Sequence, residues 1–151
     1  MADYYTHLCF AFKANDDEVD LLDAITGIDW DDEAPLPEAV AAKFPNKDEL
    51  RTAIFGEHDD LFHFGVDFHI TGNEVWVTSD GGPNLDALAN VIQLCCQDTL
   101  KQAPIGFEWS NDCSKHRPDA FGGGWCAIFH DRQEWENTAT RLEMALRGEL
   151  D

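Results

Sequence analysis

The sequence predicts an α+β fold of the ferredoxin-like kind, an antiparallel sheet with helices on one face, extended by a C-terminal hairpin strand and helix. The first observation is that the hydrophobic period switches between two residues and about 3.6 residues along the chain. The second is the resulting order: strand, helix, short helices, strand, strand, helix, strand, strand, helix. The third is that 44% of the 151 residues are hydrophobic, which is enough to build a core in a single domain spanning residues 1–151.

The N-terminal segment contains the first strand and the first long helix. Residues 4–13 alternate, with Leu8, Phe10 and Phe12 on one face. Asn15 is a favourable N-cap, acidic residues fill the first turn behind it, and Gly27 ends the helix.

Residues 28–60 predict an acidic insertion made of short helices. Pro37 suits the first turn of a helix that runs to residue 43. Asn46, with Glu49 three residues later, opens another that runs to Phe55. Residues 14–60 contain 15 acidic and 3 basic residues, a net charge of −12, so much of the negative charge is concentrated here.

The second half of the chain predicts four strands and two helices. Alternating aromatic and aliphatic residues mark a strand over 61–70, and a turn at 71–73 leads into its partner over 74–79. Helical spacing extends from residue 85 to about 99. Strands over 105–111 and 124–130 and an amphipathic helix over 134–146 follow.

The charge balance excludes some classes of function. Thirty acidic against ten basic residues leave a net charge of −20 with neutral histidines. Such a charge repels phosphate backbones and anionic lipids, so we expect no direct nucleic-acid binding, no membrane contact, and a basic partner surface. With no secretory signal and no run of about 18 apolar residues, we expect a cytoplasmic protein with reduced cysteines.

Two groups of histidines suggest metal sites. Cys113 and His116, followed by Cys126 and His130, have a zinc-like spacing. However, Cys126 and His130 lie roughly 13 Å apart along a strand, and we expect no metal.

The second group lies on the polar face of the predicted sheet. It comprises His7, His63, Asp67, His69 and Glu74. Tyr5 and Trp76 share this face and favour a partner contact over a metal site or catalysis.

The segment from Cys113 to Gly124 is a candidate anion site. It combines Lys115 and Arg117 with Gly122, Gly123 and Gly124, whose backbone N–H groups are able to approach a phosphate or carboxylate. The alternative is a hairpin loop whose glycines allow a bulge. The run C-S-K-x-R-x-D-x-F-G-G-G resembles a segment of small uncharacterised proteins found on bacterial plasmids and phages. The resemblance implies a mobile genetic element and no particular activity.

The sequence therefore favours an interaction protein over an enzyme. It contains no nucleophile elbow, metal-binding helix motif or nucleotide loop, and we expect no catalytic residue and no cofactor. The leading hypothesis is a DNA mimic that occupies the basic cleft of a nucleic-acid-binding enzyme, such as a restriction or CRISPR complex. The carboxylates proposed to imitate phosphates are Asp16, Asp17, Asp20, Asp31, Asp32, Glu33, Asp59 and Asp60.

Two alternatives stay open. One is a small enzyme or anionic-ligand binder centred on the loop from Cys113 to Gly124. The other is a salt-adapted domain whose acidity serves no partner. The oligomeric state is not predicted.

Overall fold

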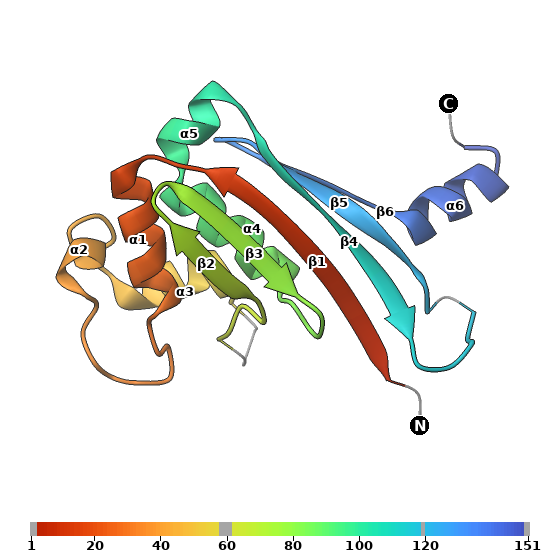
Figure 1. Ribbon diagram of the computed structural model, residues 1–151, viewed down its shortest axis with the longest axis horizontal. Coiled ribbons are helices and arrows are strands. Elements are labelled where there is room, and N and C mark those ends of the chain that lie inside the picture. Colours follow the sequence, from red (N-terminus) through yellow and green to blue (C-terminus); the bar gives the residue numbers. More distant parts are fainter. Residues whose placement is uncertain (1–2, 58–61, 119, 150–151) are drawn as a thin grey trace.

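The computed structural model of the chain describes residues 3–57, 62–118 and 120–149 (Figure 1). Its strands are β1 (Tyr4–Lys13), β2 (Asp67–Thr71), β3 (Glu74–Ser79), β4 (Ile105–Cys113), β5 (Gly122–Ile128) and β6 (Gln133–Asn137). Its helices are α1 (Asp16–Thr26), α2 (Glu38–Ala41), α3 (Lys47–Phe55), α4 (Leu85–Cys95), α5 (Gln97–Gln102) and α6 (Thr138–Leu146).

The six strands form one sheet in the order β2-β3-β1-β4-β5-β6, and every neighbouring pair is antiparallel. This confirms the α+β class and the antiparallel sheet. Because β5 and β6 continue the sheet beyond β4, it is larger than a ferredoxin-like sheet. Within the described residues, no helix is long and apolar enough to cross a membrane.

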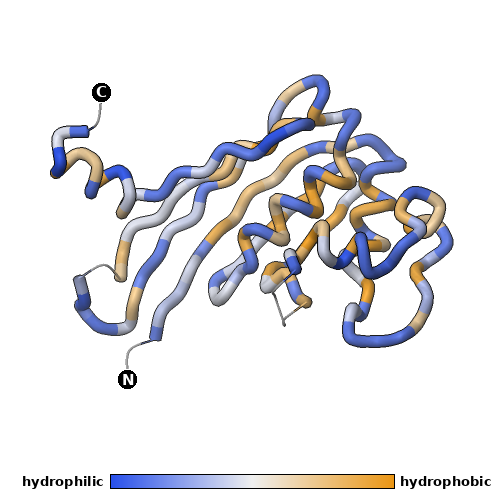
Figure 2. The backbone as a smooth tube through the Cα atoms, turned by 180° about the vertical axis from the view of Figure 1, so that it is seen from behind, coloured by the Kyte–Doolittle hydropathy of each residue, from blue (hydrophilic) through white to orange (hydrophobic). Residues whose placement is uncertain are grey.

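One face of the sheet packs against helices, and the opposite face is open. Leu8 and Phe12 of β1 point into the core, whereas Cys9 and Ala11 between them are exposed. The core is continuous from the strands to α1, α3 and α4. Figure 2 shows α4 crossing the covered face, with hydrophobic positions alternating with polar ones. The apolar side of β1, with its period of two residues, and the apolar side of α4, with its helical period, thus face the same core.

The prediction of a strand over 61–70 is wrong in extent, because only Asp67–Thr71 forms β2, and residue 61 lies outside the described residues. Gly65 adopts a φ of 66°, which breaks the extended backbone. This turn places Phe64 against Phe55 of α3, with ring centroids 5.2 Å apart. Phe62 and Phe64 therefore pack in or against the core although they lie in a loop and not in a strand.

The predicted helix over 134–146 is also wrong in its first turn. Residues Gln133–Asn137 form β6, and the helix begins only at Thr138, where Asn137 accepts a hydrogen bond from the Thr140 N–H at 2.7 Å. Pairing with β5 and packing of Trp135 on Phe107 outweigh the local helical pattern.

The predicted helix over 85–99 is interrupted at Cys96, whose ψ of 35° ends α4 and begins α5. The short helices of the insertion form as α2 and α3. The hairpin strands are shifted, since β4 continues to Cys113 and β5 starts at Gly122.

Candidate functional site

The exposed carboxylates of α1 form a row on the helix surface. The Asn15 side chain accepts a hydrogen bond from the Glu18 N–H at 2.9 Å and completes a capping box, so the helix starts at a defined residue. Val19, Leu22 and Ile25 are buried, which turns the opposite side of the helix to solvent. That side presents Asp16, Asp17, Asp20 and Asp23, all exposed.

The loop after α1 carries further exposed carboxylates. Trp30 is 3% exposed and packs edge-on against Phe55, which anchors the loop to the core. The Lys47 ammonium donates hydrogen bonds to the carbonyl oxygens of Asp32 and Ala34 at 2.8 and 2.7 Å. Lys47 therefore braces this loop through main-chain oxygens and not through the carboxylates.

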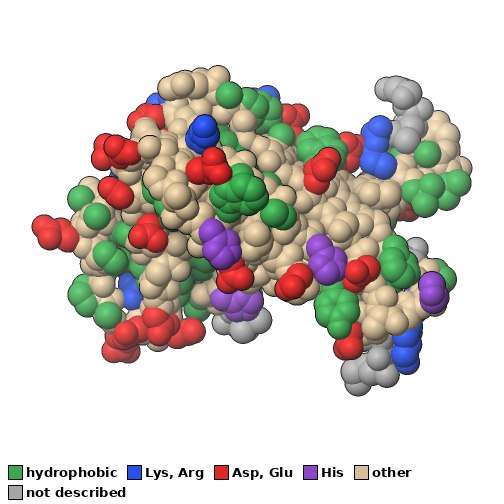
Figure 3. Space-filling view, viewed as in Figure 1, with side chains coloured by type: hydrophobic (Ala, Val, Ile, Leu, Met, Phe, Trp, Pro, Cys, Tyr) green, Lys and Arg blue, Asp and Glu red, His purple; other side chains and the backbone are tan. Residues whose placement is uncertain are grey.

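The carboxylates of this loop, on Asp31, Asp32 and Glu33, are exposed. Together with those of α1 they define the acidic surface: Asp16, Asp17, Asp20, Asp23, Asp31, Asp32 and Glu33. Among the described residues, no lysine, arginine or histidine forms an ion pair with any of them. Figure 3 shows acidic side chains gathered at this end of the molecule.

Six of the eight proposed phosphate mimics are thus exposed. Asp59 and Asp60 lie outside the described residues. Sequence reasoning missed Asp23, although its position three residues after Asp20 puts it on the same helix face.

One carboxylate of α1 points inward. Glu18 is 4% exposed and hydrogen-bonded on both carboxylate oxygens. Burial alone would raise the pKa of Glu18, but hydrogen bonds from the Thr99 hydroxyl and from the backbone N–H groups of Asn15 and Thr99 outweigh it. The pKa of Glu18 is therefore lowered. Because this carboxylate is buried, it is not part of the exposed row.

The open face of the sheet is a second candidate surface. Figure 3, viewed onto this face, shows histidines and acidic side chains interspersed on it. Tyr5, Trp76 and Trp125 are exposed there. His7 Nε2 lies 3.0 Å from Asp112 Oδ2 on the neighbouring strand.

The histidines and carboxylates of this face, for which we expected a partner contact rather than a metal site, lie on several elements. His63 lies in the loop before β2, and His69 is 3.5 Å from the Thr78 hydroxyl rather than beside His7. No group of three or more His, Cys, Asp or Glu side chains is placed to hold a metal ion in the part of the chain that the structure describes.

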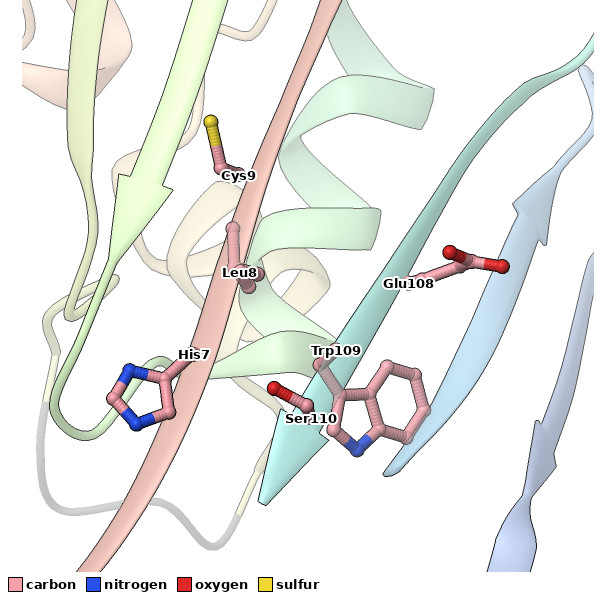
Figure 4. A pocket seen from close by; sticks show the side chains of 6 residues that line it. All are labelled: His7, Leu8, Cys9, Glu108, Trp109 and Ser110. Carbon is pink, nitrogen blue, oxygen red and sulfur yellow. The ribbon is translucent and has the colours of Figure 1, made fainter. Parts of the chain in front are cut away.

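The β1–β4 pairing is incomplete. It extends from Tyr4 with Cys113 to His7 with Ser110. Beyond this point two shallow hollows of about 370 and 420 Å³ open along the junction of the strands. Figure 4 shows β1 and β4 diverging there, with Glu108 pointing away from β1, toward β5.

The glycines of the candidate anion site lie within the sheet. Gly123 pairs with Ser110, and Gly124 pairs with Trp109 and with Asn137. A Cβ at Gly123 would lie 2.1 Å from the Trp109 carbonyl oxygen. One at Gly124 would lie 2.3 Å from the Glu136 oxygen and 2.5 Å from the Trp109 ring. Both glycines therefore have a packing role, while Lys115 and Arg117 are exposed in the preceding loop.

The zinc-like spacing does not correspond to a shared site. Cys126 is buried on the core side of β5, whereas His130 is exposed beyond the end of that strand. Burial, with a smaller contribution from Asp86, raises the pKa of the Cys126 thiol to about 12, which disfavours the thiolate that zinc requires.

An apolar groove of about 440 Å³ lies between the start of α4 and α6, with Leu85, Trp109, Trp135 and Met144 along it. On α6 itself Leu142 and Leu146 are exposed. Met144, which lines the groove, is partly buried.

Comparison with known protein families, curated proteins and solved structures found no match to this chain. The functional argument consequently depends on the geometry and charge of these surfaces.

Proposed function

We propose that the protein is an acidic interaction module that covers a basic surface of a nucleic-acid-binding protein by imitating a phosphate backbone. The observation that supports this proposal is the acidic surface. Its carboxylates are exposed, and none forms an ion pair with a lysine, arginine or histidine of the described residues. Because Trp30 and Lys47 hold the loop in place, these charges are presented in a defined arrangement. A preorganised charge array loses less conformational entropy on binding than a flexible acidic tail.

The spacing on α1 is suited to mimicry. From Asp16 to Asp23 the row covers seven residue steps, about 10.5 Å of helix axis at 1.5 Å per residue. One strand of duplex DNA presents a charge about every 3.4 Å, or about three charges over that length. Four carboxylates on α1 reach this density, and the loop after α1 adds three more exposed carboxylates.

We also infer that β1 to β4, with α1 and α4, form a ferredoxin-like unit to which β5, β6 and α6 are added. The order β2-β3-β1-β4 supports this inference, because α1 connects β1 to β2 and α4 begins the connection from β3 to β4. In this arrangement the acidic surface lies on the first helical connection.

Competition with DNA tests the function. A labelled duplex of about 20 base pairs is bound to each member of a panel of purified DNA-binding enzymes, including a restriction endonuclease and a CRISPR nuclease, and the protein is titrated in. We expect displacement from at least one enzyme, with an affinity that falls steeply with salt. Reversal of Asp31, Asp32 and Glu33 to Lys should weaken displacement at least about tenfold.

A matched control separates local from total charge. Reversal of Asp98, Asp131 and Glu134, which are exposed and lie outside the acidic surface, changes the net charge equally. Equal weakening by both triple variants, or no displacement from any enzyme at low salt, would contradict the proposal.

A further inference from the structure

The larger-volume hollow of the open face lies beside a tryptophan and a glutamate on adjacent strands. Glu108 of β4 and Trp125 of β5 are directly opposite in the antiparallel register. The hollow beside them is lined also by Cys9, Gly106 and Ala127 and has a volume of about 420 Å³. Gly106 has no side chain and Ala127 has a small one. This leaves a space that is bordered by the Trp125 indole and the Glu108 carboxylate.

Both bordering groups are available to a ligand. Trp125 is 40% exposed, and within the described residues its ring stacks on no other aromatic ring and receives no cation. Glu108 is exposed and forms no ion pair with a described lysine, arginine or histidine. In the part of the chain that the structure describes, no basic side chain lines the hollow.

A second tryptophan on the same face provides the contrast. Trp76 of β3 is 46% exposed, but its indole N–H donates a hydrogen bond to the Glu74 carboxylate. The Trp76 indole and the Glu74 carboxylate are therefore hydrogen-bond partners of each other. Glu108 and Trp125, in contrast, border a space that neither side chain fills.

We propose that this hollow binds the guanidinium group of an arginine side chain from a basic partner. The guanidinium stacks on the Trp125 indole and donates hydrogen bonds to the Glu108 carboxylate, while the aliphatic stem lies over Cys9 and Ala127. The net charge of −20 favours the approach of such a partner. This inference rests on the proposed function, because it supplies a specific anchor for the basic partner that the acidic surface attracts.

NMR titration of the ¹⁵N-labelled protein with an acetylated, amidated hexa-arginine peptide tests the inference. We expect shifts of the Trp125 indole N–H and of the Gly106 and Ala127 amides. Trp125→Ala and the nearly isosteric Glu108→Gln should each weaken these shifts at least about fivefold, since the first removes the stacking surface and the second removes the negative charge and one acceptor oxygen. Trp76→Ala is the matched control and should leave them unchanged. Hexa-lysine should bind this hollow more weakly, because an ammonium group neither stacks nor forms a bidentate pair.

The outcomes separate this site from the proposed function. Shifts confined to α1 and the loop after it would overturn the arginine site and leave the proposed function in place. Shifts at the hollow that persist when Asp31, Asp32 and Glu33 are reversed would support the arginine site. If the DNA competition fails in that case, the proposed DNA mimicry is overturned and the arginine site stands. Equal binding of hexa-lysine, equal loss with Trp76→Ala, or no shifts at the hollow would overturn the arginine assignment.

Discussion

The carboxylate of Glu18 on α1 caps the start of α5 through Thr99, 81 residues further along the chain. Its Oε2 accepts the Thr99 backbone N–H at 3.1 Å, and its Oε1 accepts the Thr99 hydroxyl and the Asn15 N–H. Cys96, the N-cap residue of α5, makes no side-chain capping bond. One carboxylate therefore satisfies donors at two helix N-termini, where a negative charge is stabilised by both helix dipoles.

Replacing this carboxylate should destabilise the fold. Glu18→Gln keeps the shape but has one acceptor oxygen for three donors, so we expect a loss of about 1–3 kcal/mol in the free energy of unfolding. Urea denaturation followed by circular dichroism measures it. The control is Asp20→Asn, an exposed position on the same helix, which should change stability by less than about 0.5 kcal/mol. Equal effects of the two substitutions would contradict the capping role.

The contribution of Glu18 should depend on pH in a defined direction. Because its pKa is lowered in the folded protein, from an ordinary value of 4.5, the unfolded chain takes up this proton first as the pH falls. The stabilisation is complete above pH 4.5 and is lost as the pH falls through the folded pKa. The stability difference between the wild type and Glu18→Gln should therefore shrink on acidification, and a difference that is constant with pH would refute this linkage.

The glycines of β5 should be intolerant of a side chain. Gly124→Ala places a methyl group against the Glu136 carbonyl and the Trp109 ring, and we expect a loss of about 1–3 kcal/mol or more. Thermal unfolding measures it. Gly81→Ala is the control, because a Cβ there meets nothing within 4 Å. If both variants are as stable as the wild type, the packing role assigned to Gly124 is wrong.

Four of the five cysteines should react with thiol reagents in two distinct classes. Cys9 is exposed and should be labelled rapidly by a disulfide reagent. Cys95, Cys96 and Cys126 are buried, and burial raises the pKa of Cys96 to about 12, so they should react only on unfolding. Peptide mass spectrometry after timed labelling identifies the sites, and Cys9→Ser should remove the fast phase. Rapid labelling of Cys96 in folded protein would contradict the buried position.

Salt dependence separates recognition from salt adaptation. Since the net charge is −20, screening should raise the free energy of unfolding by on the order of 1 kcal/mol between about 0.05 and 1 M NaCl. An interaction module should already be folded at the lower concentration, as judged by circular dichroism. A chain that is unfolded there would instead favour the salt-adapted domain.

Local sequence signals were sufficient where a single element determines its own conformation. Asn15 and Asn46 both cap helices as expected, and the alternation of residues 4–13 produces β1. The helical period also placed Leu22 and Ile25 on the apolar side of α1, and both are buried. These features depend on capping and on hydrophobic periodicity, both of which act over a few residues.

Tertiary packing decided the elements and sites whose partners are distant in sequence. Phe64, in the alternating segment before β2, packs against Phe55 from a loop. Residues 133–137 form a strand because they pair with the edge of β5. Likewise, only the register of β4 with β5 brings Glu108 opposite Trp125. The sequence by itself determined the concentration of acidic residues in 14–60, the helix caps and the open polar face. The strand order, the burial of Glu18 and the hollow on the sheet were decided by long-range pairing, whose free energy depends on contacts that no local pattern specifies.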